Sequence, residues 1–159
     1  MTTHIRIAPL ADYPDAAHLL ARWCYDEWGR DAGVSLQHEV DKFQRALDAD
    51  GLPRVMIALD GDAVIACAQL KTDELPQLPD CHYWLSAVYV APAYRGRQIA
   101  AAVIDAVVQQ ARQQGVTDLY LQTEALDGGL YRRLGWEPLC PASHHGVPVL
   151  VMRRTLIAA

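Results

Sequence analysis

The sequence has no apolar run near the roughly 18 residues that a membrane-spanning helix needs. Its first ten residues, MTTHIRIAPL, contain neither the basic segment nor the apolar core of a secretory signal. It also has no repeat, no low-complexity tract and no linker-like segment. At 159 residues, 52% apolar and 21% charged, the chain has the size and composition of one globular domain. We therefore expect a single domain over residues 1–159, in the cytoplasm and without a membrane partner.

Cysteine and basic residues are placed in ways that argue against two further classes of protein. Cys24, Cys67, Cys81 and Cys140 are far apart, and no pair has the spacing of metal ligands or of a disulfide framework. Reduced, mostly buried thiols and no metal site are the simplest interpretation. The net charge of −5 and the absence of a basic tract argue against a nucleic-acid partner.

The spacing of apolar residues predicts an alternation of strands and helices. Strands are expected at 4–8, 53–59, 63–72, 82–90, 118–123, 136–140 and 148–156. Helices are expected at 13–29, 36–49, 98–114 and 126–134. Strands gathered before one long helix, with another strand directly after it, favour a mixed α/β sheet over a doubly wound one.

Local signals set the expected ends of these elements. Asp12 is placed to cap the first helix, with Pro14 in its first turn, and Ser35 to cap the second. Asp50 and Gly51 are expected to end the second helix. In the third helix, residues spaced three and four apart predict one buried stripe: Ile99, Ala102, Val103, Ala106, Val107 and Ala111.

The stretch VYVAPAYRGRQIAAAVIDA at 88–106 is the most informative part of the sequence. It predicts a strand, a turn rich in arginine and glycine, and then a helix. The first turn of a helix offers unpaired N–H groups, on which a diphosphate can bind. Gly96 allows a close approach, while Arg95 and Arg97 supply charged donors. Taken alone, this pattern also fits simple capping of a helix.

Two motifs in this part of the chain resemble the GNAT superfamily of N-acetyltransferases. The turn from Arg95 to Ala100 is similar to its acetyl-CoA signature, Gln/Arg-x-x-Gly-x-Gly/Ala, in which Gln98 stands at a glycine position. The departure is tolerable if Gln98 has ordinary helical dihedral angles. Further along, LYRRLGW at 130–136 matches the second conserved element of the family.

The resemblance implies a GNAT fold: a mixed α/β (α+β) sheet of about six or seven strands and about four helices. In that fold the strand at 82–90 carries a bulge and splays from the strand at 118–123. Acetyl-CoA would enter the gap, with the backbone of Val88 and Val90 pairing with its pantetheine arm. The residues implied to bind the cofactor are Val88, Tyr89, Val90, Arg95, Gly96, Arg97, Gln98, Ile99, Ala100, Ala101, Thr123 and Tyr131.

The same resemblance gives Tyr131 the role of protonating the departing thiolate. A phenol with a pKa near 10 beside a thiol with a pKa near 8.5 can serve as hydrogen-bond donor or general acid. The general base is left open between Glu27, which shares a helix face with Trp23, and Glu124 at a strand end. His82 and Tyr89 are weaker candidates.

In this superfamily the first two helices and the loop before the final strand form the acceptor site. The residues expected to contact the acceptor are Trp23, Glu27, Trp28, Trp84 and Ser86. Aromatic rings near a carboxylate would suit a cationic amine.

The predicted function is therefore transfer of the acetyl group of acetyl-CoA to a primary amine. The amine is left open among small molecules (an aminoglycoside, a polyamine or an amino acid) and protein N-termini. The alternative is a non-catalytic acyl-CoA-binding or regulatory module with the same fold. Homodimers are frequent in the family, and nothing in the sequence locates an interface.

Overall fold

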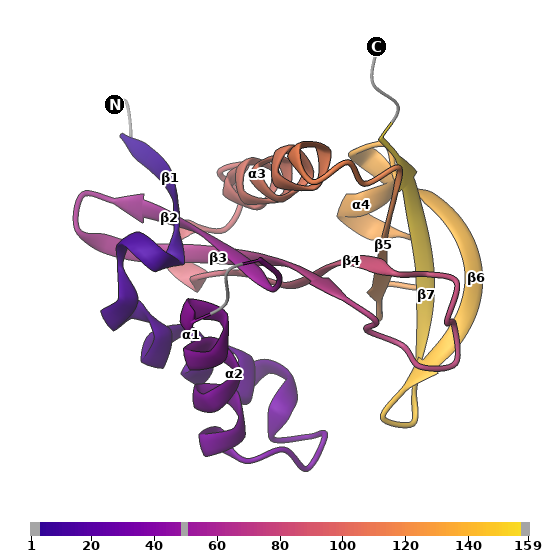
Figure 1. Ribbon diagram of the computed structural model, residues 1–159, viewed down its shortest axis with the longest axis horizontal. Helices are drawn as coiled ribbons and strands as arrows, with labels where there is room; N and C mark the ends of the chain where they lie inside the picture. The colour runs from indigo at the N-terminus through magenta and orange to yellow at the C-terminus, as the bar shows by residue number, and fades with distance from the viewer. Residues whose placement is uncertain (1–3, 49–50, 157–159) are drawn as a thin grey trace.

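The computed structural model describes residues 4–48 and 51–156. Its strands are β1 (Ile5–Pro9), β2 (Arg54–Asp60), β3 (Ala63–Thr72), β4 (Tyr83–Val90), β5 (Asp118–Thr123), β6 (Glu137–His144) and β7 (Val147–Thr155). The α-helices of the described residues are α1 (Ala17–Cys24), α2 (Leu36–Asp48), α3 (Ile99–Gln113) and α4 (Gly129–Arg133). The strands form one seven-stranded sheet in the order β1-β2-β3-β4-β5-β7-β6 (Figure 1). The predicted order of elements and the mixed sheet are thus confirmed.

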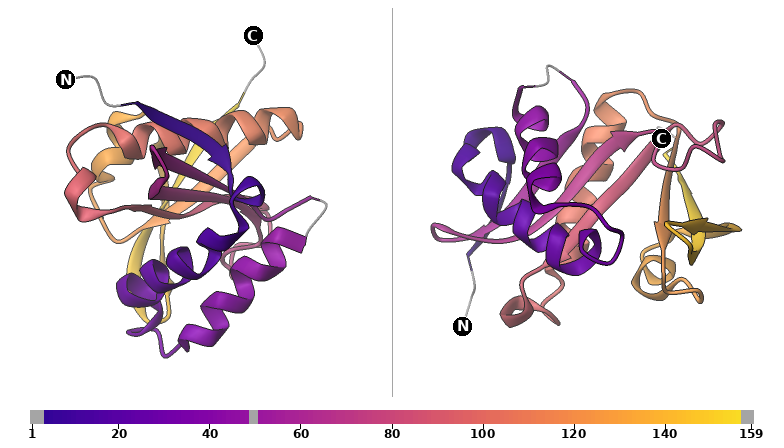
Figure 2. Two further views of the ribbon diagram at one scale, coloured as in Figure 1. Left: turned by 90° about the vertical axis from the view of Figure 1, so that its left-hand side faces the viewer. Right: turned by 90° about the horizontal axis from the view of Figure 1, so that it is seen from below.

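Helices cover both faces of the sheet, with α3 on one face and α1 and α2 on the other (Figure 2). On the α3 face, Val103 and Val107 pack into a core with Leu119 of β5. On the opposite face, Leu20 and Phe43 pack in a second cluster on the sheet. None of the helices in the described ranges is long and apolar enough to cross a membrane.

The sheet opens between β4 and β5, as the resemblance implied. These two strands run parallel and pair at Trp84 and Tyr120 alone. A bulge in β4 accompanies the opening, because Cys67 of β3 pairs with Tyr89 whereas Gln69 pairs with Ser86. A bulge bends its strand and ends regular pairing, which leaves the edge of β4 that faces β5 available.

The first helix begins later than predicted. Two short 3-10 turns, Leu10–Asp12 and Pro14–Ala16, precede α1, and no side chain caps its first turn. Asp12 cannot serve as the cap because Tyr13, directly after it, has φ −136° and ψ 60° and interrupts the helical path. By contrast Ser35 caps α2 as predicted, its Oγ accepting a hydrogen bond from the N–H of His38 at 3.0 Å. The expected end of α2 at Asp50 lies outside the described residues.

After Cys24 the chain changes from an α-helix to a π-helix over Tyr25–Gly29. The N–H of Arg30 bonds to the carbonyl of Tyr25 at 2.8 Å, a link from i to i+5. Single π turns of this kind occur often at functional sites. The turn carries two of the predicted site residues, Glu27 and Trp28.

The third helix buries a stripe that differs in part from the predicted one. Ala102 and Ala106 are only half-buried, and Ile104 and Val108 are buried instead. The helix starts at Ile99 rather than Gln98, and Gly115 follows its end with φ 77°.

Candidate active site

A cleft of about 860 Å³ lies where β4, β5 and the starts of α3 and α4 meet. The residues that line it come from the π-helix, the bulged end of β4, the turn before α3, the end of β5, and α4. They are Glu27, Trp28, Val88, Tyr89, Val90, Tyr94, Arg95, Gly96, Gln98, Ile99, Ala100, Ala101, Thr123, Ala125, Leu130, Tyr131, Arg133 and Leu134. Except for Arg97, every residue predicted to contact the cofactor lines this cleft.

At one end of the cleft, the turn before α3 presents unused backbone donors. Among the described residues, no hydrogen bond within the chain uses the N–H groups of residues 96–101. Gly96 has φ 79°, and no atom lies within 4 Å of where a Cβ would be. These donors and the positive end of the α3 dipole make this turn suitable for binding a diphosphate.

Two side chains fix this turn to the rest of the sheet. The hydroxyl of Tyr94 donates a hydrogen bond to Oδ2 of Asp60, at the β2–β3 turn, at 2.8 Å. The guanidinium of Arg97 lies over the Tyr94 ring, 5.2 Å from its centroid. Arg97 thus packs on the Tyr94 ring, and it does not line the cleft.

Arg95 folds back against β4 inside the cleft. Its Nε donates a hydrogen bond to the carbonyl of Val90 at 2.9 Å. Its guanidinium carbon lies over the Tyr89 ring, 5.4 Å from the centroid. The side chain thus holds the turn against the bulged end of β4, a role that the motif alone did not indicate.

Gln98 does not have the helical dihedral angles that would let it replace the glycine of the signature without strain. Its φ of 63° and ψ of 19° are left-handed. This is the conformation that a glycine adopts without a steric penalty, whereas a residue with a Cβ is strained there. Gln98 therefore keeps the shape of a glycine turn at an energetic cost, while its side chain adds bulk at the cleft.

The bulged end of β4 forms the floor of the cleft. Ala87 has φ 53°, which places the following residues out of register with β3. The carbonyl of Ala87 accepts a hydrogen bond from the buried thiol of Cys67 at 3.3 Å. Val88 and Val90 line the cleft beyond this point, on the edge where β5 has diverged.

Tyr131 enters the cleft from α4. Burial raises the pKa of its hydroxyl to about 12, so the phenol stays protonated at any physiological pH. Its ring lies edge-on to the buried Trp136, with the centroids 6.4 Å apart. Helix α4 begins next to Gly128, where a φ of 90° and close neighbours strain any residue with a side chain. A Cβ there would lie 3.0 Å from Cε of Met152.

The opposite wall of the cleft carries Glu27 and Trp28 from the π-helix. Trp23 does not line the cleft; it stacks on Tyr89, with centroids 4.9 Å apart and an interplanar angle of 28°. Trp28 meets the same Tyr89 ring edge-on at 6.4 Å.

Glu39 of α2 supports this wall from behind and was missed by the sequence analysis. It is only 5% exposed, and its Oε1 would lie 3.3 Å from a Cβ on Gly29 of the π-helix. Its Oε2 pairs with Nζ of Lys42 at 3.3 Å. The sequence feature that could have identified Glu39 is its position four residues before Phe43, on the buried face of α2.

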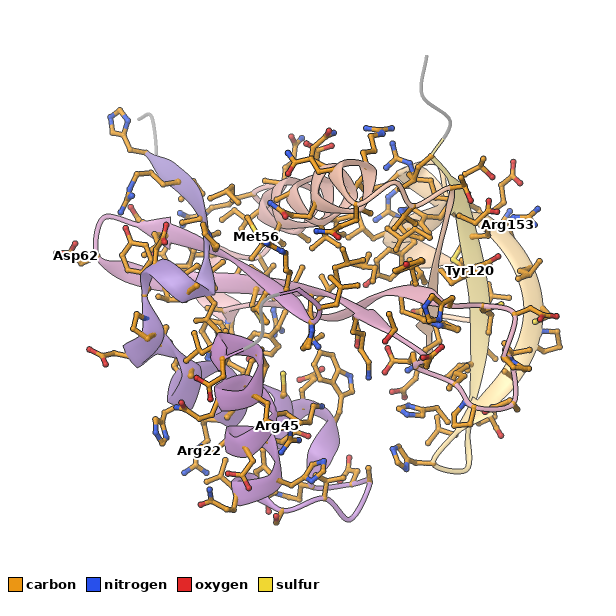
Figure 3. All side chains as sticks on the ribbon, in the orientation of Figure 1. Arg22, Arg45, Met56, Asp62, Tyr120 and Arg153 are labelled. Carbon is orange, nitrogen blue, oxygen red and sulfur yellow. The ribbon has the colours of Figure 1, made fainter. Side chains whose placement is uncertain are left out.

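Two predicted acceptor residues lie elsewhere. Trp84 is fully buried, and its Nε1 donates a hydrogen bond to the carbonyl of Cys81 at 2.6 Å. Its indole packs against Tyr120, which Figure 3 labels on β5. Ser86 pairs with Gln69 within the sheet and does not line the cleft. Both belong to the sheet itself.

Two candidates for the general base are also outside the cleft. Glu124 follows the lining residue Thr123, but it is exposed and does not line the cleft. His82 forms an exposed pair with Oδ1 of Asp73, 2.8 Å from its Nδ1. Of the titratable base candidates, Glu27 and Tyr89 line the cleft. No group of three or more possible metal ligands is found among the described residues.

Comparisons with known proteins agree with this arrangement. The model of the family described as "Acetyltransferase (GNAT) family" matches residues 14–136. No curated protein matches the sequence.

Solved structures share the fold at low sequence identity. An aminoglycoside 6'-acetyltransferase type Ii has a TM-score of 0.74 at 17% identity, covering 97% of this chain and 99% of its own. An aminoglycoside 6'-N-acetyltransferase complexed with coenzyme A has a TM-score of 0.75 at 15% identity, covering 97% and 98%. A Salmonella typhimurium protein solved with its cofactor acetyl-CoA has a TM-score of 0.70 at 15% identity, covering 98% and 95%.

Proposed function

Because the chain belongs to the acetyltransferase (GNAT) family, we propose that it is an enzyme that transfers the acetyl group of acetyl-CoA directly to a primary amine. One observation carries this proposal. A single cleft joins a row of free backbone N–H groups, a splayed strand edge, a buried tyrosine hydroxyl and a carboxylate.

The first half of the cleft fits coenzyme A. The N–H groups of residues 96–101 would bind the diphosphate, and the open space at Gly96 lets it approach the backbone. The edge of β4 at Val88 and Val90, which β5 leaves unpaired, would hydrogen-bond to the pantetheine arm, with the carbonyl of Val90 already accepting one bond from Arg95. Two of the structurally similar proteins were solved with coenzyme A or acetyl-CoA bound, which supports this placement. When bound, acetyl-CoA supplies an activated acetyl group as a thioester.

Tyr131 is proposed to stabilise the departing sulfur. Its pKa of about 12 lies roughly 3.5 units above that of a free thiol. Complete transfer of its proton to a thiolate would therefore cost about 5 kcal/mol at equilibrium. Tyr131 acts best as a hydrogen-bond donor that keeps its own proton, and the thiolate finally takes a proton from the amine or from water.

Glu27 is proposed to receive the amine. An α-amine with a pKa near 8 needs little help at neutral pH, whereas a lysine-like amine near 10.4 must lose a proton first. As a carboxylate that lines the cleft, Glu27 can hold an ammonium group and pass its proton to water. The candidate acceptors remain small-molecule amines and protein N-termini.

The test is amine-dependent release of the coenzyme A thiol, measured with a thiol reagent. Tyr131→Phe should lower kcat about 100-fold while acetyl-CoA binds with unchanged affinity. Tyr120→Phe is the matched control, because burial also raises the pKa of Tyr120 but its ring lies outside the cleft.

A second candidate function is a non-catalytic module that binds acyl-CoA. The strained, bulky Gln98 at the diphosphate turn favours it, since both features weaken a cofactor site. Binding of acetyl-CoA without acetylation of any amine, and with identical behaviour of Tyr131→Phe, would establish the module and refute the enzyme.

A further inference from the structure

More cations than anions line the cleft. Glu27 is the one carboxylate among its lining residues, while Arg95 and Arg133 contribute two guanidinium groups. Three other carboxylates on neighbouring elements each lie beside a cation, whereas Glu124 is exposed next to the lining residue Thr123. These pairs are Asp26 with Arg30 at 2.8 Å, Glu39 with Lys42 at 3.3 Å, and Glu74 with Lys71 at 3.4 Å.

Four aromatic residues line the cleft: Trp28, Tyr89, Tyr94 and Tyr131. Tyr131 is proposed to face the sulfur of the cofactor, and Tyr94 lies at the diphosphate turn with its hydroxyl bonded to Asp60. Trp23 stacks on the Tyr89 ring, and the guanidinium of Arg95 lies over that same ring. Two groups of this size leave little of Tyr89 for a ligand. Trp28 is 36% exposed and lines the cleft. Outside the part of the cleft proposed for the cofactor, its indole is therefore the aromatic surface left for an acceptor, next to the carboxylate of Glu27.

From these two features we propose that the acceptor is a monoamine: a molecule with one ammonium group on a neutral, largely apolar body. The ammonium binds between Glu27 and the indole of Trp28, where both a charge and a cation–π contact are available. Additional ammonium groups would find no second carboxylate among the lining residues, and the guanidinium of Arg133 would repel them. Polyamines and aminoglycosides are thus poor acceptors.

This inference rests on the proposed function and narrows it. The aminoglycoside acetyltransferases that share the fold are similar at only 17% and 15% identity. In the reaction, the ammonium loses one proton to solvent, its nitrogen forms a bond to the acetyl carbon, the carbon–sulfur bond breaks, and a second proton from the nitrogen goes to the departing thiolate. The products are the N-acetyl monoamine and the coenzyme A thiol, with one proton released to solvent.

The experiment measures kcat/KM with acetyl-CoA for three amines: 2-phenylethylamine, spermidine and kanamycin. We expect 2-phenylethylamine to exceed both polycations by about tenfold or more, because each additional ammonium group would lack a carboxylate in the cleft, and an unfavourable charge contact costs at least that factor. Glu27→Gln should lower kcat/KM for 2-phenylethylamine about tenfold or more. Trp28→Ala should raise its KM, and Trp28→Phe should restore most of the loss.

Asp26→Asn is the matched control, since Asp26 lies on the same π-helix but pairs with Arg30 outside the cleft. It should leave the kinetics with 2-phenylethylamine unchanged. Glu27 and Asp26 are both exposed, so both variants should unfold at the wild-type temperature.

The possible results distinguish a wrong acceptor from a wrong function. Higher kcat/KM for spermidine or kanamycin than for 2-phenylethylamine would overturn the monoamine assignment and leave the acetyltransferase intact. Equal kinetics for Glu27→Gln and wild type would also overturn it. If wild type acetylates none of the three amines or a broader panel, the proposed function fails, and the acceptor assignment fails with it.

Discussion

Replacing Gln98 with glycine should stabilise the protein. Gln98 has a left-handed backbone, which costs a residue with a Cβ roughly 1–2 kcal/mol. Glycine removes that cost but adds about 0.5–1 kcal/mol of conformational entropy to the unfolded chain. The net gain in the free energy of unfolding is about 0.5–1 kcal/mol, which for a chain of this size raises Tm by roughly 1–4 °C.

The substitution should also strengthen binding of acetyl-CoA. The side chain of Gln98 lines the cleft where the diphosphate is proposed to bind, and glycine removes it. Gln98→Ala separates the two effects, because alanine removes the same bulk beyond Cβ but keeps the left-handed strain. We expect both variants to bind acetyl-CoA more tightly by calorimetry, and only Gln98→Gly to melt at a higher temperature.

Gln109→Gly in the middle of α3 is the control for glycine itself. Gln109 is exposed and helical, so glycine there should destabilise the protein by about 0.5–1 kcal/mol. The reasoning is refuted if Gln98→Gly melts at or below the temperature of Gln98→Ala.

Three further predictions concern Tyr131, Gly128 and Trp84. At saturating acetyl-CoA and amine, Tyr131 should cause no loss of kcat between pH 8 and 10, since its pKa is about 12 and its proton is lost only above that range; a decline with an apparent pKa near 10 that Tyr131→Phe abolishes would contradict this. Gly128→Ala should lower stability by about 2 kcal/mol or more, because its Cβ would press on Met152 at 3.0 Å. Gly33→Ala, whose Cβ would meet nothing within 4 Å, should lower the free energy of unfolding by only about 1 kcal/mol. Equal melting temperatures of the two variants would show that contact with Met152 does not destabilise Gly128→Ala. Trp84→Phe should lower the free energy of unfolding, measured in urea, by about 2–3 kcal/mol through lost packing and a broken buried hydrogen bond. If the variant instead changes the KM for the acceptor at unchanged stability, Trp84 does contact the acceptor.

Most of the architecture could be predicted from short-range patterns. The Asp-Gly turn at residues 60–61 and the cap at Ser35 act through neighbouring residues, so the β2–β3 hairpin and the start of α2 were located correctly. The splay of β4 from β5 came from the resemblance, not from any local signal. The start of α1 was wrong because the dihedral angles of Tyr13 are not visible in the sequence.

The site residues that short-range patterns place were also predicted correctly, whereas those placed by the folded sheet were not. Those beside the two motifs line the cleft, since the motif itself fixes their place in the turn or in α4. Trp84 was assigned to the acceptor because aromatic residues cluster near it in sequence. Its burial depends on the 75–81 loop and on Val151 of β7, which reach it only in the folded sheet. The left-handed angle of Gln98 is likewise a property of the closed turn.

We propose that acetyl-CoA binds in the cleft between β4 and β5, with its diphosphate on the N–H groups of residues 96–101. Titration of the 15N-labelled protein with acetyl-CoA, followed by amide chemical shifts, tests this directly. We expect the largest shifts at residues 96–101, with further shifts at Val88 and Val90 and little change along β1 and β2. Binding that leaves the amides of 96–101 unmoved, or that shifts a different surface, would contradict it.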